Sequence, residues 1–327
     1  MNFLKLIRVQ NLLFIAFIQL MMRQVVLLPI LQKYGFEIAR DHTYLILLII
    51  ATVFIAAGGY VLNDYFDVKI DAINRPKKLI VGKDISKRTA MLLHQILTGV
   101  GTLTGLVLAY STRSFTLAFI FIVVPGLLWF YSASYKRQFL TGNLIVSFVA
   151  ALTVLVVAIA ELAVLKKEFG GLVYETPIPA EFYGWMGGFA IFSFLTTWIR
   201  EIIKDMEDEH GDREMECRTM PIKWGLKKTK IFVYFLIVVT ISALLFADYF
   251  LIDFEGSLTL RFVLVGLALP LIILIYLISV AKTPYQFHQA STLVKFIMLV
   301  GVLYSLVFYY LMAKTYGFSL FDLFMVK

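Results

Sequence analysis

Nine apolar segments, each about as long as a membrane is thick, dominate this chain of 327 residues. A helix needs about 20 mainly apolar residues to cross a bilayer core, and its backbone groups are then bonded internally. Only 16% of the residues are charged, against roughly 25% in soluble domains. We therefore expect an all-α, polytopic membrane protein with about nine transmembrane helices. The segments cover about residues 11–31, 43–62, 89–110, 115–131, 142–162, 183–199, 229–248, 260–280 and 293–314.

The basic residues are distributed unevenly between the connecting segments. If the N-terminus is cytoplasmic, 20 of the 30 Lys and Arg residues fall on the cytoplasmic side, as the positive-inside rule predicts. The net charge of +8 then lies mostly beside anionic lipid headgroups, and it requires no nucleic acid partner. The first segment is too long for a removable signal peptide and lacks a small-residue cleavage site. The single cysteine, Cys217, excludes an intramolecular disulfide and a thiolate metal cluster.

Two clusters of aspartates with identical spacing follow the second and sixth apolar segments. Carboxylates at i, i+3 and i+7 share one face of a helix. Because four segments separate the clusters, both helices leave the membrane on the same side. This suggests a single domain with two parallel, bundle-like halves, about 1–141 and 142–290, plus a last helix at 293–314. The aspartates are Asp64, Asp67 and Asp71 in the first cluster and Asp205, Asp208 and Asp212 in the second.

Three carboxylates on one helix face repel each other unless a cation neutralises them. Mg²⁺ prefers oxygen ligands and is commonly held by one or two carboxylates together with substrate phosphates. Two facing clusters can hold two such ions with a diphosphate between them, and Asn63 can add an amide group. The alternative is a pair of solvated helix ends with local salt bridges, which two matched clusters make less attractive. The cations available for the diphosphate charge are Arg75, Lys136, Arg137, Arg200, Lys204 and Arg218.

Two basic segments and one arginine each have two interpretations. Residues 73–88 and 213–230 form long basic segments, either ordinary positive-inside loops or caps over the acidic clusters. Arg23 lies in the middle of a span, where a charge is costly. It could bind an acceptor phosphate or carboxylate, or it could form a structural hydrogen bond. We expect Lys295, near the start of the last span, to extend to the membrane interface.

These motifs resemble the UbiA superfamily of intramembrane prenyltransferases. Residues 63–76 and 200–221 are similar to the two aspartate-rich motifs of that family, and residues 131–143 resemble its Tyr/Lys segment. The tyrosine role could belong to Tyr131 or Tyr135, because the Tyr131-to-Lys136 spacing is one residue longer than the commonest form. The resemblance also implies substrate-binding roles for Arg8, Asn11 and Asn143.

The resemblance implies helices around a central cavity and Mg²⁺-dependent transfer of a polyprenyl group from its diphosphate to a lipophilic acceptor. An apolar wall would shield the allylic cation, and Tyr131 is the favoured residue to face it. Residues 63–76 and 200–212 look most like the digeranylgeranylglyceryl phosphate synthases, whose acceptor is a prenylated glycerol phosphate. This implies ether-lipid synthesis in a prokaryotic plasma membrane, with the mouth of the active site facing the cytoplasm.

Three competing functions remain. The same chemistry could act on an aromatic acceptor in quinone biosynthesis. A cation-coupled transporter would place its acidic groups near the membrane midplane, whereas these lie at the ends of apolar segments. A CDP-alcohol phosphotransferase requires a D-x-x-D-G-x-x-A-R pattern, but Val68 follows Asp67 here.

Overall fold

The computed structural model describes residues 2–36, 42–76, 79–320 and 324–325. Within these ranges, nine helical spans are long and apolar enough to cross a membrane, and each contains one of the nine predicted segments. The prediction of an all-α polytopic membrane protein is therefore confirmed.

The first span is built from three consecutive helical pieces that follow the short helix α1 (Asn2–Leu6). These pieces are α2 (Val9–Met21), the π-helical η1 (Met22–Leu27) and α3 (Leu28–Lys33). The next spans are α4 (Thr43–Asn74), α5 (Lys87–Ser111), α6 (Phe115–Ala133), α7 (Thr141–Phe169) and α8 (Ile178–Glu207). The last three are α10 (Met220–Phe250), α11 to α12 (Leu258–Val280, with the π-helical η5 at Phe262–Ala268) and α13 (Pro284–Tyr316).

Short elements connect these spans. They are η3 (Tyr135–Arg137), η4 (Gly170–Glu175), α9 (Glu209–Glu214) and a small antiparallel pair, β1 (Ser319–Leu320) with β2 (Phe324–Met325).

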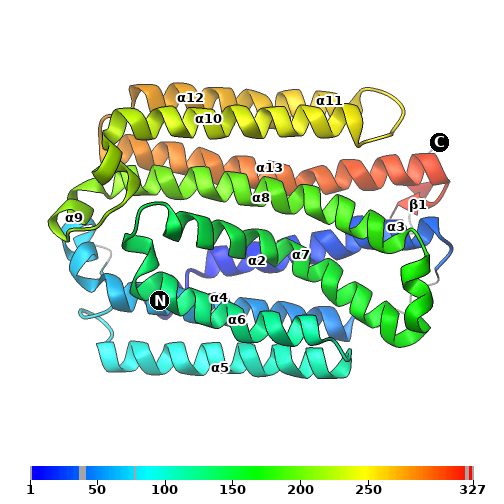
Figure 1. Cartoon of the computed structure of the whole chain (residues 1–327), viewed down its shortest axis with the longest axis horizontal. Coiled ribbons are helices and arrows are strands. Elements are labelled where there is room, and N and C mark those ends of the chain that lie inside the picture. Colours follow the sequence, from blue (N-terminus) through cyan, green and yellow to red (C-terminus); the bar gives the residue numbers. More distant parts are fainter. Residues whose placement is uncertain (1, 37–41, 77–78, 321–323, 326–327) are drawn as a thin grey trace.

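The spans lie side by side with their long axes roughly aligned (Figure 1). α10 and α12 form one flank, α5 and α6 form the other, and α2, α7, α8 and α13 run between them. α9, which follows α8, packs against α4. The two aspartate clusters therefore lie at the same end of the bundle, which we call the acidic end.

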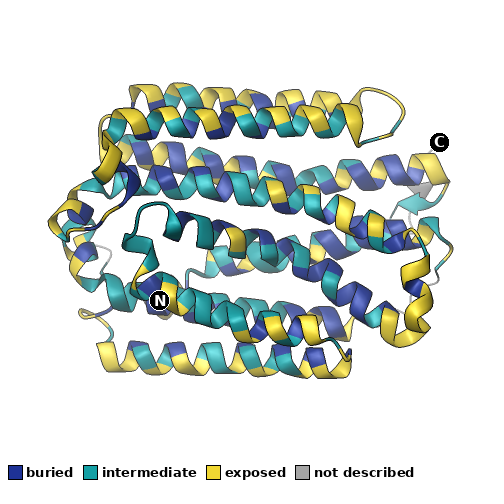
Figure 2. Cartoon of the chain, viewed as in Figure 1, coloured by how far each residue is buried: buried dark blue, intermediate teal, exposed yellow. Residues whose placement is uncertain are grey.

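The outer helices carry many exposed residues (Figure 2), and several of these residues are large and apolar. Examples are Leu103 on α5, Phe119 on α6 and Val265 on η5, each about two-thirds exposed. Such a broad apolar surface is unfavourable in water and suited to lipid. Three buried apolar clusters lie among the described residues, and α8 and α13 contribute side chains to the two larger ones.

The helices near the acidic end are longer than the apolar pattern suggested. α4 continues beyond the predicted segment 43–62 and carries the whole first cluster to Asn74. The expectation that 213–230 is a loop is wrong for most of its length, because α10 begins at Met220. Pro221 lies in the first turn of α10, where proline costs no hydrogen bond and its fixed φ suits a helix.

Candidate functional site

The first aspartate cluster is bound by cations from two other parts of the chain. Arg8, which precedes α2, donates from Nη2 to Asp64 Oδ1 at 2.8 Å. Lys136 on η3 forms an ion pair with Asp67 and donates to Asn63 Oδ1 at 3.2 Å. Asn63 in turn donates to Asp67 Oδ2 at 2.8 Å. Five predicted site residues, from α4, η3 and the turn before α2, thus meet here.

A glycine allows Lys136 to reach this position. A Cβ atom on Gly142 would lie 2.6 Å from Lys136 Cα and 2.8 Å from the carbonyl oxygen of Tyr135. Both contacts are closer than real Cβ atoms tolerate, so only glycine lets α7 begin this close to η3. The next residue, Asn143, donates to Asp205 Oδ2 at 2.9 Å. The start of α7 therefore connects η3 to the second cluster.

The second cluster does not lie on one continuous helix, contrary to the prediction from its spacing. α8 ends at Glu207, and Asp208 has φ −96° and ψ 7°, so that Asp212 belongs to α9. Asn74 stabilises this break: it accepts from the Gly211 N–H at 2.9 Å and donates to the Asp208 carbonyl at 3.2 Å. A Cβ on Gly211 would lie 2.6 Å from the Asn74 amide.

Asn74 and its neighbour join the two clusters directly. Arg75 donates from Nη2 to both carboxylate oxygens of Asp208 at 2.8 Å and to Glu207 at 3.1 Å. The bridging role of Asn74 was missed by the sequence analysis. Its position inside the Asn-Arg-Pro stretch, directly before Arg75, was the available signal.

The carboxylates that follow α8 are electrostatically perturbed. Burial raises the pKa of Asp208, although the charge of Arg75 opposes this. Burial, then the charge of Asp208, raises the pKa of Asp212 to about 6, and a hydrogen bond from Thr219 partly offsets the shift. Asp67 on α4 also contributes to this shift, which shows that the two clusters lie within electrostatic range of each other.

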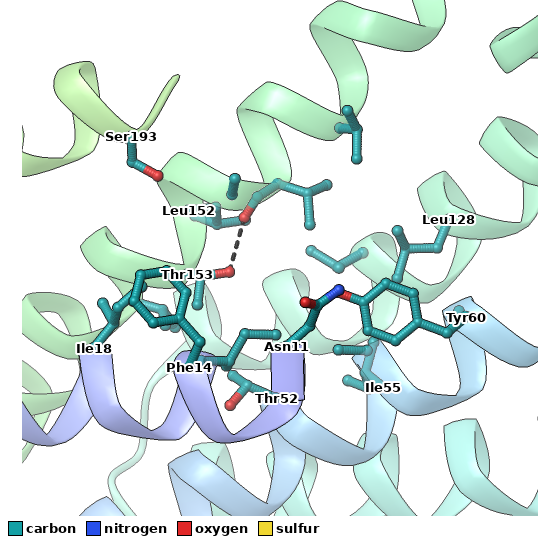
Figure 3. A pocket seen from close by; sticks show the side chains of 18 of the residues that line it. Asn11, Phe14, Ile18, Thr52, Ile55, Tyr60, Leu128, Leu152, Thr153 and Ser193 are labelled. Atoms are coloured by element: carbon teal, nitrogen blue, oxygen red, sulfur yellow. Dashed lines mark hydrogen bonds between the residues drawn. The ribbon is translucent and has the colours of Figure 1, made fainter. Parts of the chain in front are cut away.

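An elongated cavity of about 480 Å³ lies between α2, α4, α6, α7, α8 and α13. Apolar side chains such as Phe14, Ile18 and Ile55 line much of it, and Asn11 and Tyr60 also face it (Figure 3). Tyr60 lies one helical turn before Asp64. The Cζ atom of Arg8 lies over the Tyr60 ring, 5.0 Å from the ring centroid. The polar end of the cavity therefore adjoins the acidic clusters.

The structure separates the two candidate tyrosines. Tyr131 lines the cavity, within electrostatic range of Glu201, Asp205 and Asp67. Tyr135 is absent from the cavity lining and packs instead against Phe130, with ring centroids 6.1 Å apart. The geometry thus favours Tyr131 for a role toward a bound molecule.

Arg23 lies in a different region from the other candidate residues. It is buried and paired with Glu161 at 3.1 Å, and it also contacts the Tyr44 hydroxyl and His42 Nδ1. It lines a second cavity of about 230 Å³, not the one that adjoins the aspartates. The structure therefore supports the structural alternative for Arg23. The interpretation as an acceptor-binding residue of the main cavity is not supported, because Glu161 already neutralises the charge.

The remaining predicted cations differ in their placement. Arg200 lines the main cavity and, like Lys204, binds Glu201. Arg137 contacts the Phe66 carbonyl at 3.4 Å. Arg218 has an exposed side chain. Its backbone N–H donates to the Arg137 carbonyl at 2.7 Å, which places its backbone beside η3.

The donor set at the acidic end fits Mg²⁺ that arrives with a phosphate ligand. Within the described ranges, no three acidic, histidine or cysteine side chains are grouped as a ready-made metal site. The aspartates instead contact arginine, lysine, asparagine and threonine. All six aspartates carry hard oxygen atoms that could ligate Mg²⁺, which typically takes only one or two carboxylates, the rest of its ligands being water and substrate phosphate.

Comparisons with known proteins agree with this arrangement. A digeranylgeranylglyceryl phosphate synthase from Methanosphaera stadtmanae is 32% identical over 204 residues, which is 62% of this chain and 66% of that protein. The match thus spans just under two-thirds of that relative. A solved structure described as a digeranylgeranylglyceryl phosphate synthase in membranes superimposes with a TM-score of 0.59 at 25% identity, covering 94% of this chain and 98% of the other.

A UbiA homolog from Archaeoglobus fulgidus, solved with DMAPP and Mg²⁺, shares the fold with a TM-score of 0.55. Its sequence identity is 15%, over 94% of this chain and 99% of that one. The model of the UbiA prenyltransferase family matches residues 34–300, which include both aspartate clusters. The chain therefore belongs to the UbiA prenyltransferase family.

Proposed function

We propose that this protein transfers a polyprenyl group from its diphosphate to a lipophilic acceptor in a Mg²⁺-dependent reaction. The observation that carries the proposal is the meeting of two carboxylate clusters at the polar end of an apolar cavity of about 480 Å³. The clusters suit a metal-bound diphosphate, and the cavity suits an isoprenoid chain. Membership of the UbiA family supports the same chemistry.

The diphosphate would lie between the clusters, with all six aspartates available to two Mg²⁺ ions. When bound, Mg²⁺ would supply charge neutralisation that makes diphosphate a better leaving group. Lys136 and Arg75 now neutralise Asp67 and Asp208. These long side chains can turn toward diphosphate oxygens when the carboxylates take metal ligation, so the cations would stabilise the leaving group.

The allylic C–O bond would break with its electron pair leaving on the diphosphate. Phe14, Ile18 and Phe121 line the cavity and would keep water from the resulting carbocation. The Tyr131 ring faces the same space. An acceptor hydroxyl oxygen would then form the new C–O bond and release its proton.

Our preferred acceptor is geranylgeranylglyceryl phosphate, which corresponds to ether-lipid synthesis. Two relatives of this chain carry the name digeranylgeranylglyceryl phosphate synthase. The basic residues flanking the spans support a cytoplasmic acidic end in a prokaryotic plasma membrane. The matched aspartate clusters support two parallel halves within one domain, about 1–141 and 142–290, with the last helix added.

The test is a transfer assay with purified protein, Mg²⁺ and radiolabelled geranylgeranyl diphosphate. One reaction contains geranylgeranylglyceryl phosphate, and another contains a panel of aromatic acids and quinone precursors. Product in the first reaction alone supports the proposal. Product only in the second keeps prenyl transfer but replaces the acceptor, and no product from any prenyl diphosphate with folded protein would contradict the proposal.

A further inference from the structure

A lysine that the proposed mechanism does not use faces the main cavity. Lys295, on α13, lines the cavity and has an exposed side chain. The sequence led us to expect that Lys295 extends to the membrane interface, and the structure adds that it lies in the lining of the cavity. Among the residues that the structure describes, it makes no hydrogen bond and no ion pair. A charge left unpaired at membrane depth is costly, and it marks a functional site by default.

The electrostatic surroundings of Lys295 are mainly cationic. The groups close enough to act on it include Arg8, Arg200 and Lys204. The one carboxylate in that set, Glu201, is already bonded to Arg200 at 2.6 Å and to Lys204 at 3.1 Å. Arg8 is likewise paired, with Asp64, so Lys295 is the cation of this set that has no ion pair in the described part of the chain. An anion bound beside Lys295 would supply the missing counter-charge.

Arg200 provides a second group for such an anion. It lines the same cavity, and its Nε atom is buried without a hydrogen-bond partner in the described part of the chain. An unsatisfied buried donor is destabilising, so a bound acceptor atom there would be stabilising. Arg200 and Lys295 approach the cavity from α8 and α13, two helices that pack against each other.

This basic pair is distinct from the cations that contact the aspartates. Arg200 precedes Asp205 by five residues on α8, or about 7 Å along the helix axis. Lys136 and Arg75, by contrast, bind Asp67 and Asp208 at the acidic end itself. Lys295 pairs with none of these aspartates in the described part of the chain. Lys295 and Arg200 thus form a basic pair in the cavity lining, separate from the cations that bind Asp67 and Asp208.

We infer that Lys295, together with Arg200, binds the phosphate of the acceptor lipid and makes the enzyme selective for a phosphorylated acceptor. This inference rests on the proposed prenyl transfer and deepens it. A lysine ammonium provides a point charge for phosphate, and the arginine fork adds directed hydrogen bonds. With its phosphate held by this pair, the acceptor would present its hydroxyl to the allylic carbon on the membrane side of the diphosphate.

The experiment compares wild-type protein with Lys295→Met, Lys295→Arg and a control, Lys314→Met, whose lysine lies on α13 outside the cavity lining. Each is assayed with geranylgeranyl diphosphate and two acceptors: geranylgeranylglyceryl phosphate and the same lipid without its phosphate. Lys295→Met should raise KM for the phosphorylated acceptor about tenfold or more, the effect of losing one charged hydrogen bond. In Lys295→Arg and Lys314→Met, the KM for the phosphorylated acceptor should stay within about threefold of the wild-type value.

The KM for the donor and the rate with the unphosphorylated lipid should change less than about twofold in Lys295→Met, which also shows that the variant is folded. An equal loss of transfer activity with the phosphorylated and the unphosphorylated acceptor would indicate a structural role for Lys295 and overturn the inference. An unchanged KM for the phosphorylated lipid would do the same. Wild-type transfer to aromatic acids alone would overturn this inference and keep prenyl transfer, whereas no transfer to any acceptor would overturn both proposals.

Discussion

Two regions of this protein hold buried or half-buried ion pairs, and they are built differently. In the Arg23–Glu161 pair, the side chains are 1% and 3% exposed, and Tyr44 and His42 form further hydrogen bonds with the guanidinium. At the acidic end, the Arg75–Asp208 pair has side chains that are 32% and 25% exposed. The first region is closed, and the second remains accessible.

The difference distinguishes a structural ion pair from a binding site. Arg23 and Glu161 satisfy each other inside the helix bundle, so a ligand would have to break a buried pair to bind there. At the acidic end, carboxylates of both clusters adjoin a cavity, and their cationic partners come from separate elements. Cations such as Arg75 and Lys136 could therefore turn from an aspartate to a bound phosphate without breaking a fully buried ion pair. The same ionic chemistry thus suits stability in one region and, as we propose, substrate binding in the other.

The largest expected effect is on stability, at the closed pair. Glu161→Ala would leave Arg23 buried without a counter-charge and should lower the free energy of unfolding by about 3–5 kcal/mol. Turnover per folded molecule should stay within about threefold of wild type. Denaturant unfolding in detergent, combined with the transfer assay, measures both. Glu168→Ala, a nearby glutamate on the same helix, is the control, and Arg23→Met with Glu161→Leu should recover much of the lost stability.

The second effect should appear in turnover, at the acidic end. Asp67→Ala and Asp208→Ala should each reduce kcat by about 10²-fold or more, because each removes an oxygen ligand from a preorganised electrostatic site. Melting temperatures should fall much less than for Glu161→Ala. Asp253→Ala, outside both clusters, is the matched control. Turnover near the wild-type value in either variant would remove these residues from the metal site.

A third, smaller effect concerns the contact that connects the clusters. Gly211→Ala would place a Cβ about 2.6 Å from the Asn74 amide and should cost about 1–3 kcal/mol of stability through overpacking. Turnover should fall as well, because Asp208 and Asp212 flank this contact. Gly184→Ala, where a Cβ meets nothing within 4 Å, should change neither stability nor turnover. Equal behaviour of the two variants would show that the Asn74 contact does not position the second cluster.

The smallest expected effect is a dependence of Mg²⁺ binding on pH. Burial raises the pKa of the Asp212 carboxyl to about 6, so this group is protonated at lower pH and must lose its proton to bind a metal ion. Metal affinity should therefore fall as the pH decreases through about 6. Mg²⁺ and an unreactive diphosphate analogue, added together, should raise the melting temperature several-fold less at pH 5 than at pH 7.5. An equal shift at both values would contradict a role for Asp212 in metal binding.

Much of the fold could be predicted because the bilayer restricts the choice of structure. Each apolar segment had to form a helix that satisfies its own backbone, so all nine spans were found. The ends of the helices were less predictable. Hydropathy does not distinguish a helix that continues into the interface from one that stops, and α4 therefore extends well past the predicted boundary at residue 62.

The site was predictable where residue types and spacing carried the information. Both aspartate clusters, Asn63 and Lys136 could be found in this way, and the structure brings them to one end of the bundle. The contacts of Asn74 and the place of Lys295 in the cavity lining depend on residues far apart in the sequence, which spacing alone does not reveal. The pairing of Arg23 with Glu161 joins residues on two different spans for the same reason.

The most direct test of the central claim is the metal dependence of prenyl transfer at the two aspartate clusters. Purified protein would be stripped of divalent metal, assayed with geranylgeranyl diphosphate and acceptor, and then assayed again after Mg²⁺ is added. We expect no product without metal, full recovery with Mg²⁺, and at most about 1% of wild-type turnover in Asp67→Ala under the same conditions. Undiminished transfer by the metal-free protein would contradict the account.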